Sequence, residues 1–340
     1  MTRKLLLGTT ALAGLGALIA VTPASAIETS VGGYARWGVV FGEVDTVTGN
    51  PKARNFYFRE EFEVHVNAKG KDDATGTEYG VQVQLETDRG SDDIKVDEQW
   101  IWLKGNWGEV RLGNEDGAAD LMKITAGSIA AGTGGIDGWF NVVAPVGIHL
   151  LNSSDASKIV YFTPNISGFE AGISFTPDSG QFGADLPRHN DGHYENWIEA
   201  GAAYTADMGG AKFRVGGQFS RADHEVNGFL DFTGYSLGAQ VEVSGIKVAG
   251  SWARNSFDNP NDNTRWTLGV GAALGPANVS ITGVKEFNDN SSSDPRNIVL
   301  SGDVTLLPGV ALQGDVAFWD LDTGGNDNGV TGVLVVRVGM

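Results

Sequence analysis

The 340-residue chain contains no cysteine, which rules out a disulfide framework, a thiol nucleophile and any cysteine-ligated metal site. Beyond the first 26 residues it also lacks any hydrophobic run near the roughly 20 residues that a membrane-spanning helix needs. Basic residues are few, because 24 Lys and Arg face 42 Asp and Glu, giving a net charge of −18. Such an acidic surface repels phosphate backbones, so nucleic acid is excluded as a partner.

Motifs for catalysis are missing as well. The sequence has no phosphate-cradling glycine loop before a helix and no serine in a nucleophile-elbow context. Its five histidines are scattered, and His189 and His193 are four apart in a polar loop rather than on an evident helix. A solvated loop is the favoured interpretation there, with metal binding as the alternative. We therefore expect a protein that is not an enzyme and that carries no cofactor.

The N-terminus has the three parts of a secretory signal. "MTRK" is basic, "LLLGTTALAGLGALIAV" is apolar, and "TPASA" ends in the small-x-small pattern of a cleavage site. Residues 1–26 are predicted to be a signal peptide cleaved after Ala26, and a membrane-anchoring helix is the alternative. Cleavage would remove Arg3 and Lys4 but no acid, so the net charge would go from −18 to −20. The remaining residues, 27–340, are predicted to form one domain.

Alternation with a period of two dominates this domain. In "GFEAGISFT", residues 168–176, Phe169, Ile173 and Phe175 share one face with Ala171, and polar or small residues share the other. This pattern predicts a β-strand with one apolar and one polar face. It recurs about sixteen times, and the predicted strands are 29–41, 54–68, 77–88, 96–104, 108–114, 157–164, 168–176, 194–206, 211–221, 232–243, 246–255, 264–274, 277–287, 296–306, 309–320 and 330–340.

Short and long connections alternate between these strands. From residue 157 onward, tight turns such as "VSGI" at 243–246 take turns with long acidic loops such as "NSFDNPNDN" at 255–263. In a meander, alternate connections lie at the same end, so one end carries turns and the other carries loops. This asymmetry is typical of an all-β, transmembrane, antiparallel up-and-down β-barrel. The apolar faces would contact lipid, and the polar faces would line a wet lumen. Aromatic residues near strand ends fit interfacial girdles, namely Tyr34, Phe41, Tyr57, Phe58, Trp266, Phe318 and Trp319.

One connection breaks the rhythm. About forty residues separate the strand 108–114 from the strand that begins near Ser157, and they are small, apolar and glycine-rich. A loop of this length usually has a function, and this composition suits a segment that packs against protein. Within it, "DGAADLMK" is predicted to form a short helix.

The run "WLKGNWGEVRLGNEDG", the long third loop, and then "SKIVYFTPNISGFEAGISF" resemble the Gram-negative general porins, particularly those of alphaproteobacteria. The resemblance extends over the mature chain and is sharpest at 102–175. It implies a sixteen-stranded outer-membrane barrel, a homotrimer, and a third loop that folds into the pore and narrows it. One departure is the final residue: such porins commonly end in an aromatic, whereas this chain ends in Met340, which puts the efficiency of barrel insertion in question.

The resemblance also implies a constriction in which acids of the third loop face bases on the wall. The acidic candidates are Glu115, Asp116, Asp120 and Asp137. The basic candidates, which the period of two places on the lumen side, are Arg36, Arg59, Arg111, Lys212 and Arg214. The same rule directs Lys247, Glu61, Glu63, Glu170, Glu242 and Asp303 into the lumen.

The expected function is a water-filled channel for passive diffusion of ions and small hydrophilic solutes. Acidic outer loops would concentrate cations at its mouth, so we expect a weak cation preference. Two alternatives remain. One is a channel specific for sugars or dicarboxylates, for which Trp100, Trp102 and Trp139 offer a stacking track. The other is an adhesin or structural barrel with a closed lumen.

Partners follow from the compartment. We expect contacts with outer-membrane lipid and lipopolysaccharide, in addition to copies of the chain itself. Acidic loop segments such as "DNPNDN" and "DNDNSSSD" offer oxygen ligands to Ca²⁺, and divalent cations there would bridge to lipopolysaccharide phosphates. Neither segment has the spacing of a helix-loop-helix calcium site, and simple solvated loops are the favoured interpretation.

Overall fold

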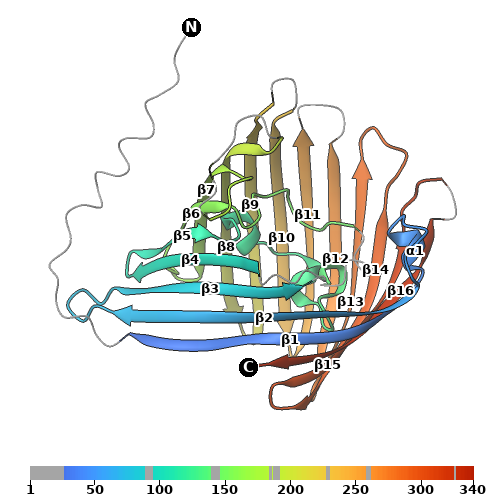
Figure 1. Cartoon of the computed structure of the whole chain (residues 1–340), viewed down its shortest axis with the longest axis horizontal. Helices are drawn as coiled ribbons and strands as arrows, with labels where there is room; N and C mark the ends of the chain where they lie inside the picture. The colour runs from blue at the N-terminus through green and yellow to red at the C-terminus, as the bar shows by residue number, and fades with distance from the viewer. Residues whose placement is uncertain are drawn as a thin grey trace, which may run out of the picture.

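The protein is a closed barrel of sixteen antiparallel strands, seen in a computed structural model (Figure 1). The structure describes residues 27–88, 95–138, 146–183, 186, 192–226, 230–257, 262–324 and 327–340. The predicted signal peptide therefore lies outside the described residues. Every strand pairs with its neighbours in sequence, and β1 closes the barrel against β16, with Tyr34 opposite Gly339. In Figure 1, β1–β3 cross in front of β9–β13 at a steep angle, because strands on opposite walls of a tilted barrel run in different directions.

All sixteen predicted strands are confirmed, most of them to within two residues at either end. Their bounds are β1 Glu28–Gly42, β2 Phe56–Lys71, β3 Glu78–Asp88, β4 Lys95–Gly105, β5 Gly108–Asn114, β6 Ser157–Phe162, β7 Phe169–Asp178, β8 Tyr194–Met208, β9 Ala211–His224, β10 Phe232–Val243, β11 Ile246–Phe257, β12 Asn263–Leu274, β13 Ala277–Asn288, β14 Arg296–Leu307, β15 Val310–Asp320 and β16 Asn328–Gly339.

Helical structure is confined to connections. The first loop contains α1, Val44–Val47, which the sequence did not predict. The connection between β5 and β6, residues 115–156 and here called L3, contains the predicted short helix as α2, Ala118–Leu121. It also contains two unpredicted 3₁₀ turns, η2 Ala126–Ile129 and η3 Gly135–Asp137. Within the described part of the chain, none of the helices has the length and apolarity to cross a membrane.

The two faces of the wall differ as the alternation predicts. On β7, Phe169, Ile173 and Phe175 are exposed on the outside, whereas Ser174 and Thr176 are buried on the inside. Most predicted girdle aromatics, such as Phe58, Trp266 and Phe318, are exposed on the outer face.

Three of the girdle assignments were wrong. Tyr34 and Trp319 occupy inward positions of β1 and β15, and Trp319 is only 2% exposed. Tyr57 is also inward, because it shares its face with Arg59 and Glu61 two and four residues further along β2. Proximity to a strand end thus misled where the period of two gave the correct face.

L3 lies inside the barrel along one side of the wall. Its helix α2 contacts β6–β9, η2 contacts β11–β13, and η3 contacts β13–β15. In Figure 1 these turns are seen between the front strands and the strands behind them. The loop therefore occupies the lumen, as the resemblance to porins implies.

Inward glycines provide the room for L3. A Cβ added to Gly238 would lie 2.1 Å from the carbonyl oxygen of Ile124, and one added to Gly201 would lie 2.7 Å from the Cβ of Met122. Gly216, Gly269 and Gly271 also face atoms of L3 at 3.1 Å or less. A side chain at Gly238 or Gly271 would overlap a backbone oxygen of L3, and one at Gly201, Gly216 or Gly269 would press on side chains of L3. The glycine content of β8–β12 therefore allows the loop to lie directly on the wall.

We expect Gly238→Ala to displace L3 without preventing barrel formation. The added methyl would overlap a backbone oxygen that no rotamer change can move, and overpacking of this kind costs about 1–3 kcal/mol. Thermal unfolding and limited proteolysis of the refolded protein would report a lower midpoint and new cleavage within L3. Gly302→Ala is the matched control, because its nearest neighbouring atom lies at 3.6 Å. Equal protease resistance of both variants would contradict this account of the glycines.

Candidate functional site

The tip of L3 is held by polar side chains of β12–β15. Backbone N–H groups of L3 donate to hydroxyl oxygens of the wall: Ala126 to Thr267 at 3.0 Å, and Ala131 to Ser280 at 2.8 Å. The Asp315 carboxylate accepts both the N–H and the hydroxyl of Thr133. These bonds satisfy backbone groups that a loop inside a barrel would otherwise bury without partners.

Further hydrogen bonds join backbone groups of L3 to polar side chains of the wall. They join Ala118 to Ser174, Gly132 to Asp303 and Gln313, Ile136 to Thr282, and Met122 to Gln218. Most of these wall partners are Ser, Thr, Gln or Asp, and each one belongs to the lumen-facing set of its strand.

The second half of L3 returns along the wall to β6. Arg265 of β12 donates to the His149 carbonyl at 2.8 Å, and Leu151 N–H donates to Asn255 at 3.2 Å. At the end of the loop, the buried Lys158 ammonium donates to the backbone carbonyls of Glu115, Ser154 and Ala156. The first and last residues of L3 are thereby joined through one cation, which fixes both ends of the loop.

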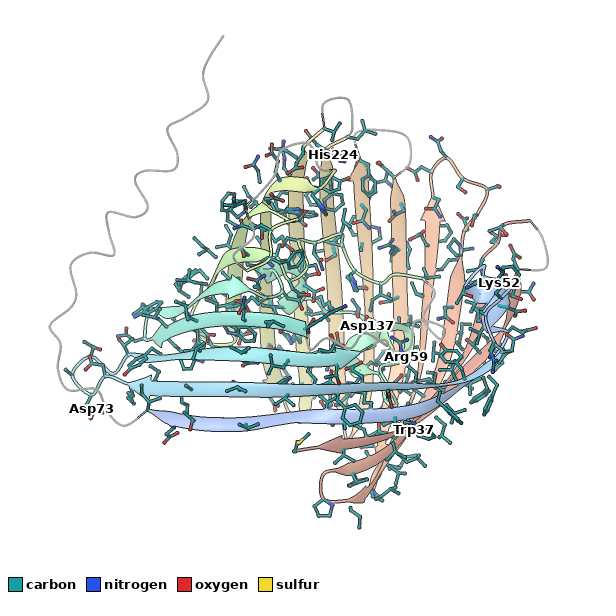
Figure 2. All side chains as sticks on the ribbon, in the orientation of Figure 1. Trp37, Lys52, Arg59, Asp73, Asp137 and His224 are labelled. Carbon is teal, nitrogen blue, oxygen red and sulfur yellow. The ribbon has the colours of Figure 1, made fainter. Side chains whose placement is uncertain are left out.

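A second group of charged residues lies on β1, β2 and β16. Two guanidinium groups lie over the ring of Tyr34, with Arg36 at 4.4 Å and Arg337 at 5.0 Å from its centroid. Its hydroxyl donates to Glu61 and Glu63 of β2. Arg59 occupies the next inward position of β2, opposite Gly38, and is labelled in Figure 2. The charged residues of β1, β2 and β16 thus interact with one another. The hydrogen bonds described above for L3 go to other strands.

The predicted basic residues therefore fall into two sets. Arg36 and Arg59 belong to the β1–β2 group, whereas Arg111 and Arg214 line a recess of about 290 Å³ next to Leu121 and Met122 of L3. Lys212 is the second residue of β9 and lies opposite Glu242, so it is closer still to the end of the barrel that carries the tight turns. All five are inward, but the structure does not gather them into one patch.

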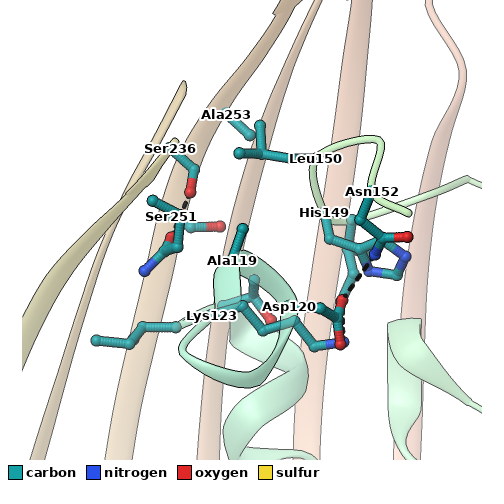
Figure 3. A pocket seen from close by; sticks show the side chains of 13 residues that line it. Ala119, Asp120, Lys123, His149, Leu150, Asn152, Ser236, Ser251 and Ala253 are labelled. Atoms are coloured by element: carbon teal, nitrogen blue, oxygen red, sulfur yellow. Dashed lines mark hydrogen bonds and ion pairs between the residues drawn. The ribbon is translucent and has the colours of Figure 1, made fainter. Parts of the chain in front are cut away.

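Two of the predicted acids have basic partners on their own side of the lumen. Glu115 is 2% exposed and binds Arg111 at 2.9 Å, and Asp120 binds Lys123 at 3.0 Å and Asn152 at 3.2 Å (Figure 3). Burial lowers the pKa of Lys123, but the charges of Asp120 and Asp137 outweigh burial and raise that pKa. Lys123 thus remains cationic, and the pair is a neutral unit that braces L3.

Asp116 has a different environment. Its carboxylate and those of Glu98 on β4 and Asp155 at the end of L3 all lie within 4.8 Å of one another. Burial, together with the charges of Asp120 and Asp155, raises the pKa of Asp116 to about 7. Because like charges this close disfavour joint ionisation, the charge of this group changes near neutral pH.

The remaining predicted residues have simpler surroundings. Asp137, the fourth acid, is exposed at the end of η3 and is labelled in Figure 2. Trp100 and Trp102 are inward on β4, and the Trp102 indole lies against Gly80, 2.6 Å from where a Cβ would be. Trp139 and His189 lie outside the described residues. In the acidic loops, Asp262 and Asp289 both bind Arg254, at 2.9 and 2.7 Å.

Arg337, Glu98 and Asp155 were missed in the sequence analysis. Arg337 could have been found, because its neighbours Val336 and Val338 belong to the apolar face of the last strand. Arg337 must therefore project into the lumen. Glu98 could also have been found, because it lies two residues before Trp100 on the inward face of β4. Asp155 joins the site only because L3 returns to its starting point.

Comparison with known proteins agrees with this fold. Residues 8–324 match the family model described as Gram-negative porin. The chain is 26% identical over 223 residues to outer membrane porin protein 32 of Delftia acidovorans, covering 64% of this chain and 62% of that protein. It is 29% identical over 175 residues to an uncharacterized protein of Rickettsia bellii, covering 44% of this chain. The match spans 39% of the length of that relative.

Solved structures share the architecture at low sequence identity. A mutant of the Rh. blastica porin superimposes with a TM-score of 0.67 at 16% identity, covering 92% of this chain and 100% of that one. The anion-selective porin from Comamonas acidovorans has a TM-score of 0.66 at 19% identity, with coverages of 93% and 100%. With the barrel, the inserted L3 and a family match over most of its length, the chain belongs to the Gram-negative porin family and is an outer-membrane porin, not an enzyme.

Proposed function

We propose that this porin is a general diffusion channel with a weak cation preference, in which ions and small hydrophilic solutes pass between L3 and the β1–β4 and β16 side of the wall. The observation that carries the proposal is the one-sided attachment of L3. Among the described residues, its hydrogen bonds to the wall run to strands from β5 to β15, and the charged group on β1, β2 and β16 is bonded within itself. The passage is thereby left on the side away from the anchors.

The proposed preference rests on the arrangement of the charges that line the passage. Glu115 and Asp120 are paired with Arg111 and Lys123, so they contribute little net field. The carboxylates of Glu98, Asp116 and Asp155 form a group of one sign, and Asp137 is exposed. Arg36, Arg59 and Arg337 belong to the group on β1, β2 and β16, which also contains Glu61 and Glu63. Opposed charges of this kind produce a transverse field and only a modest selection by sign.

A homotrimer is part of the proposal, and family membership supports it. The outer face of β1 and β2 supplies a second argument, because Trp37, Phe56 and Phe58 cluster there with ring centroids 5.1 and 5.7 Å apart. All three are at least 45% exposed in the single chain. An aromatic cluster of this size is suited to burial between subunits.

The solute-specific alternative is less well supported. Trp100 and Trp102 do face the lumen, but Trp102 is packed flat on Gly80, which is the arrangement of a wall side chain rather than a free stacking surface. A conductance measurement alone distinguishes the diffusion channel from a barrel with a closed lumen. Planar-bilayer recordings of the refolded protein, with the reversal potential taken across a KCl gradient, should show channels in steps of three with a modest preference for K⁺. Absence of channels from correctly folded protein would remove the diffusion function.

We expect the cation preference to rise with pH through about 7. Asp116 is neutral below its raised pKa of about 7 and negative above it, so the acid group gains charge between pH 6 and 8. One unit charge about 7 Å from a permeating ion in water favours K⁺ by about 0.6 kcal/mol and disfavours Cl⁻ by the same amount, which is about sevenfold in the K⁺/Cl⁻ ratio before salt screening. Reversal potentials at pH 5.5, 7 and 8.5 measure this change.

Asp116→Asn should weaken the pH dependence of the ratio, and Arg337→Gln should raise the ratio at every pH. The charged groups around Asp116 are Glu98 on β4, Lys158 on β6, and Asp120, Lys123 and Asp155 in L3. If the Asn variant keeps the full pH dependence of the parent, another of these groups titrates and the assignment to Asp116 is wrong.

Asp315→Ala is expected to loosen L3 within an intact barrel. The carboxylate accepts two hydrogen bonds from Thr133, and bonds to a charged acceptor are worth about 1.5–3 kcal/mol each. Single-channel currents should then show brief fluctuations that the parent lacks. Glu242→Gln removes a lumen-facing acid of β10 that has no hydrogen bond to the described part of L3, and its currents should stay quiet. Quiet currents from both variants would mean that Asp315 does not hold the loop.

A further inference from the structure

The outer surface of the barrel carries a groove over β10–β14 that the channel function does not use. Its volume is about 740 Å³, and its apolar walls include Leu237, Trp252, Trp266, Leu268 and Ile298. Leu237, Leu268 and Trp266 are 63%, 67% and 55% exposed. A volume of this size lies within the range of sites that hold a drug-sized ligand.

A single row of side chains crosses this surface. Register pairs Trp252 with Trp266, Trp266 with Lys285, and Lys285 with Arg296. Residues paired across antiparallel strands project on the same face, so two indoles and two cations stand side by side along the edge of the groove. Lys285 and Arg296 line the same groove as Trp266 and Ile298, which places both bases on the outer face.

The row lies near the loop end of the barrel. Lys285 is three residues before the end of β13, Arg296 is the first residue of β14, and both flank the loop between these strands. In an outer-membrane barrel the long loops face outward, so this is the level of the outer-leaflet headgroups. A cation on the lipid face costs about 2–4 kcal/mol at the midplane but about 0–1 near the interface, so the row sits where such residues are tolerated.

The basic residues at the loop end of the outer face differ in whether they form ion pairs. Arg254 binds Asp262 and Asp289, and Arg296 binds Asp320 at 2.8 Å while 59% of its side chain stays exposed. Lys285 has an aromatic neighbour instead: its ammonium lies 4.7 Å from the centroid of Phe287, and it forms no ion pair with the described acids. One cation in a lipid-level row of aromatics is therefore left without an acidic partner, and an anion in the headgroup layer would supply one.

We propose that this surface binds a phosphorylated lipid of the outer leaflet, with its acyl chains in the groove and its phosphate on Lys285 and Arg296. The groove matches the apolar part of such a molecule, and the two cations match its charge. Lysine and arginine both donate several charge-assisted bonds to a phosphate, and the flanking indoles suit the interface between headgroup and chain. The site depends on the membrane placement of the barrel and not on conduction, so either proposal can fail without the other.

A free anion and a second copy of the chain are the competing occupants. A free anion would make no use of the apolar groove. A second copy would have to place an acid beside Lys285 within an apolar contact, because an unpaired ammonium there carries a desolvation cost, whereas a lipid presents its phosphate at this level. The aromatic cluster of β1 and β2 offers a subunit contact with no exposed base among its three rings.

The experiment is native mass spectrometry of the detergent-extracted, delipidated, full mature chain, titrated with bis-phosphorylated lipid A. Dephosphorylated lipid A and inorganic phosphate are added in parallel. We expect one tight lipid per chain, binding about tenfold weaker in Lys285→Gln, weaker again in Lys285→Gln with Arg296→Gln, and preserved in Lys285→Arg. Lys71→Gln is the matched control, because it removes one exposed base at the turn end of β2. Heat-modifiable migration in gels confirms that each variant is folded.

Amine labelling of Lys285 separates the remaining outcomes. In the delipidated oligomer Lys285 should react with an amine reagent, and phosphorylated lipid A should protect it. Equal affinity for dephosphorylated lipid A, or equal protection by inorganic phosphate, would overturn the proposed division between groove and phosphate. A Lys285 that is already shielded in the lipid-free oligomer would assign the surface to a second copy and also overturn it.

Discussion

The hydrogen bonds between the backbone of L3 and the inner wall are the constraint on which this porin depends. A loop inside a barrel has few neighbours of its own kind, and its N–H groups need acceptors if they are not to be buried unpaired. Thr267, Ser280 and Thr282 supply hydroxyl oxygens, while Asp303 and Asp315 supply carboxylates. The wall thus supplies hydrogen-bond acceptors for the backbone of L3, as a neighbouring strand does in a sheet, but the acceptors belong to side chains. Side-chain acceptors need not follow a strand register, so the loop can cross the wall instead of following one strand.

This attachment divides the lumen into two sectors with different chemistry. Under L3 the wall needs small residues for close approach, such as Gly238 against Ile124, and short polar residues as partners. Near the loop end, α1 packs on β16, and further along β1, β2 and β16 long charged side chains such as Arg36 and Arg337 stack on Tyr34. The position of L3 therefore accounts for both compositions: glycine, serine and threonine where the loop lies on the wall, and arginine and glutamate on β1, β2 and β16.

The sequence was sufficient to predict the strands and their faces but not the relations between them. Period-two alternation placed Ser174 and Asp303 inside and Phe175 outside, because each residue's face depends only on its own strand. The pairing of Glu115 with Arg111 could not be predicted in this way, since it depends on how L3 leaves β5. The face of Glu98 follows from the period of two, but its proximity to Asp116 and Asp155 depends on the register of β3 and β4 and on the path of L3. Long connections and irregular register are the places where pattern alone stops being informative.

The height of a residue along the barrel is determined by strand register, whereas its face is determined by the period of two. A residue's face is set by parity, whereas its neighbours at the same height are set by the register of every strand between them. Arg36 and Arg111 are both inward and basic, yet register places one beside Tyr34 and Arg337 and the other in the recess near Leu121. On the outside, register brings Trp252, Trp266, Lys285 and Arg296 from four strands into one row. Because a closed barrel leaves no free edge at which register can slip, rows of this kind are as firmly fixed as the strands themselves, and they can serve as binding surfaces on either side of the wall.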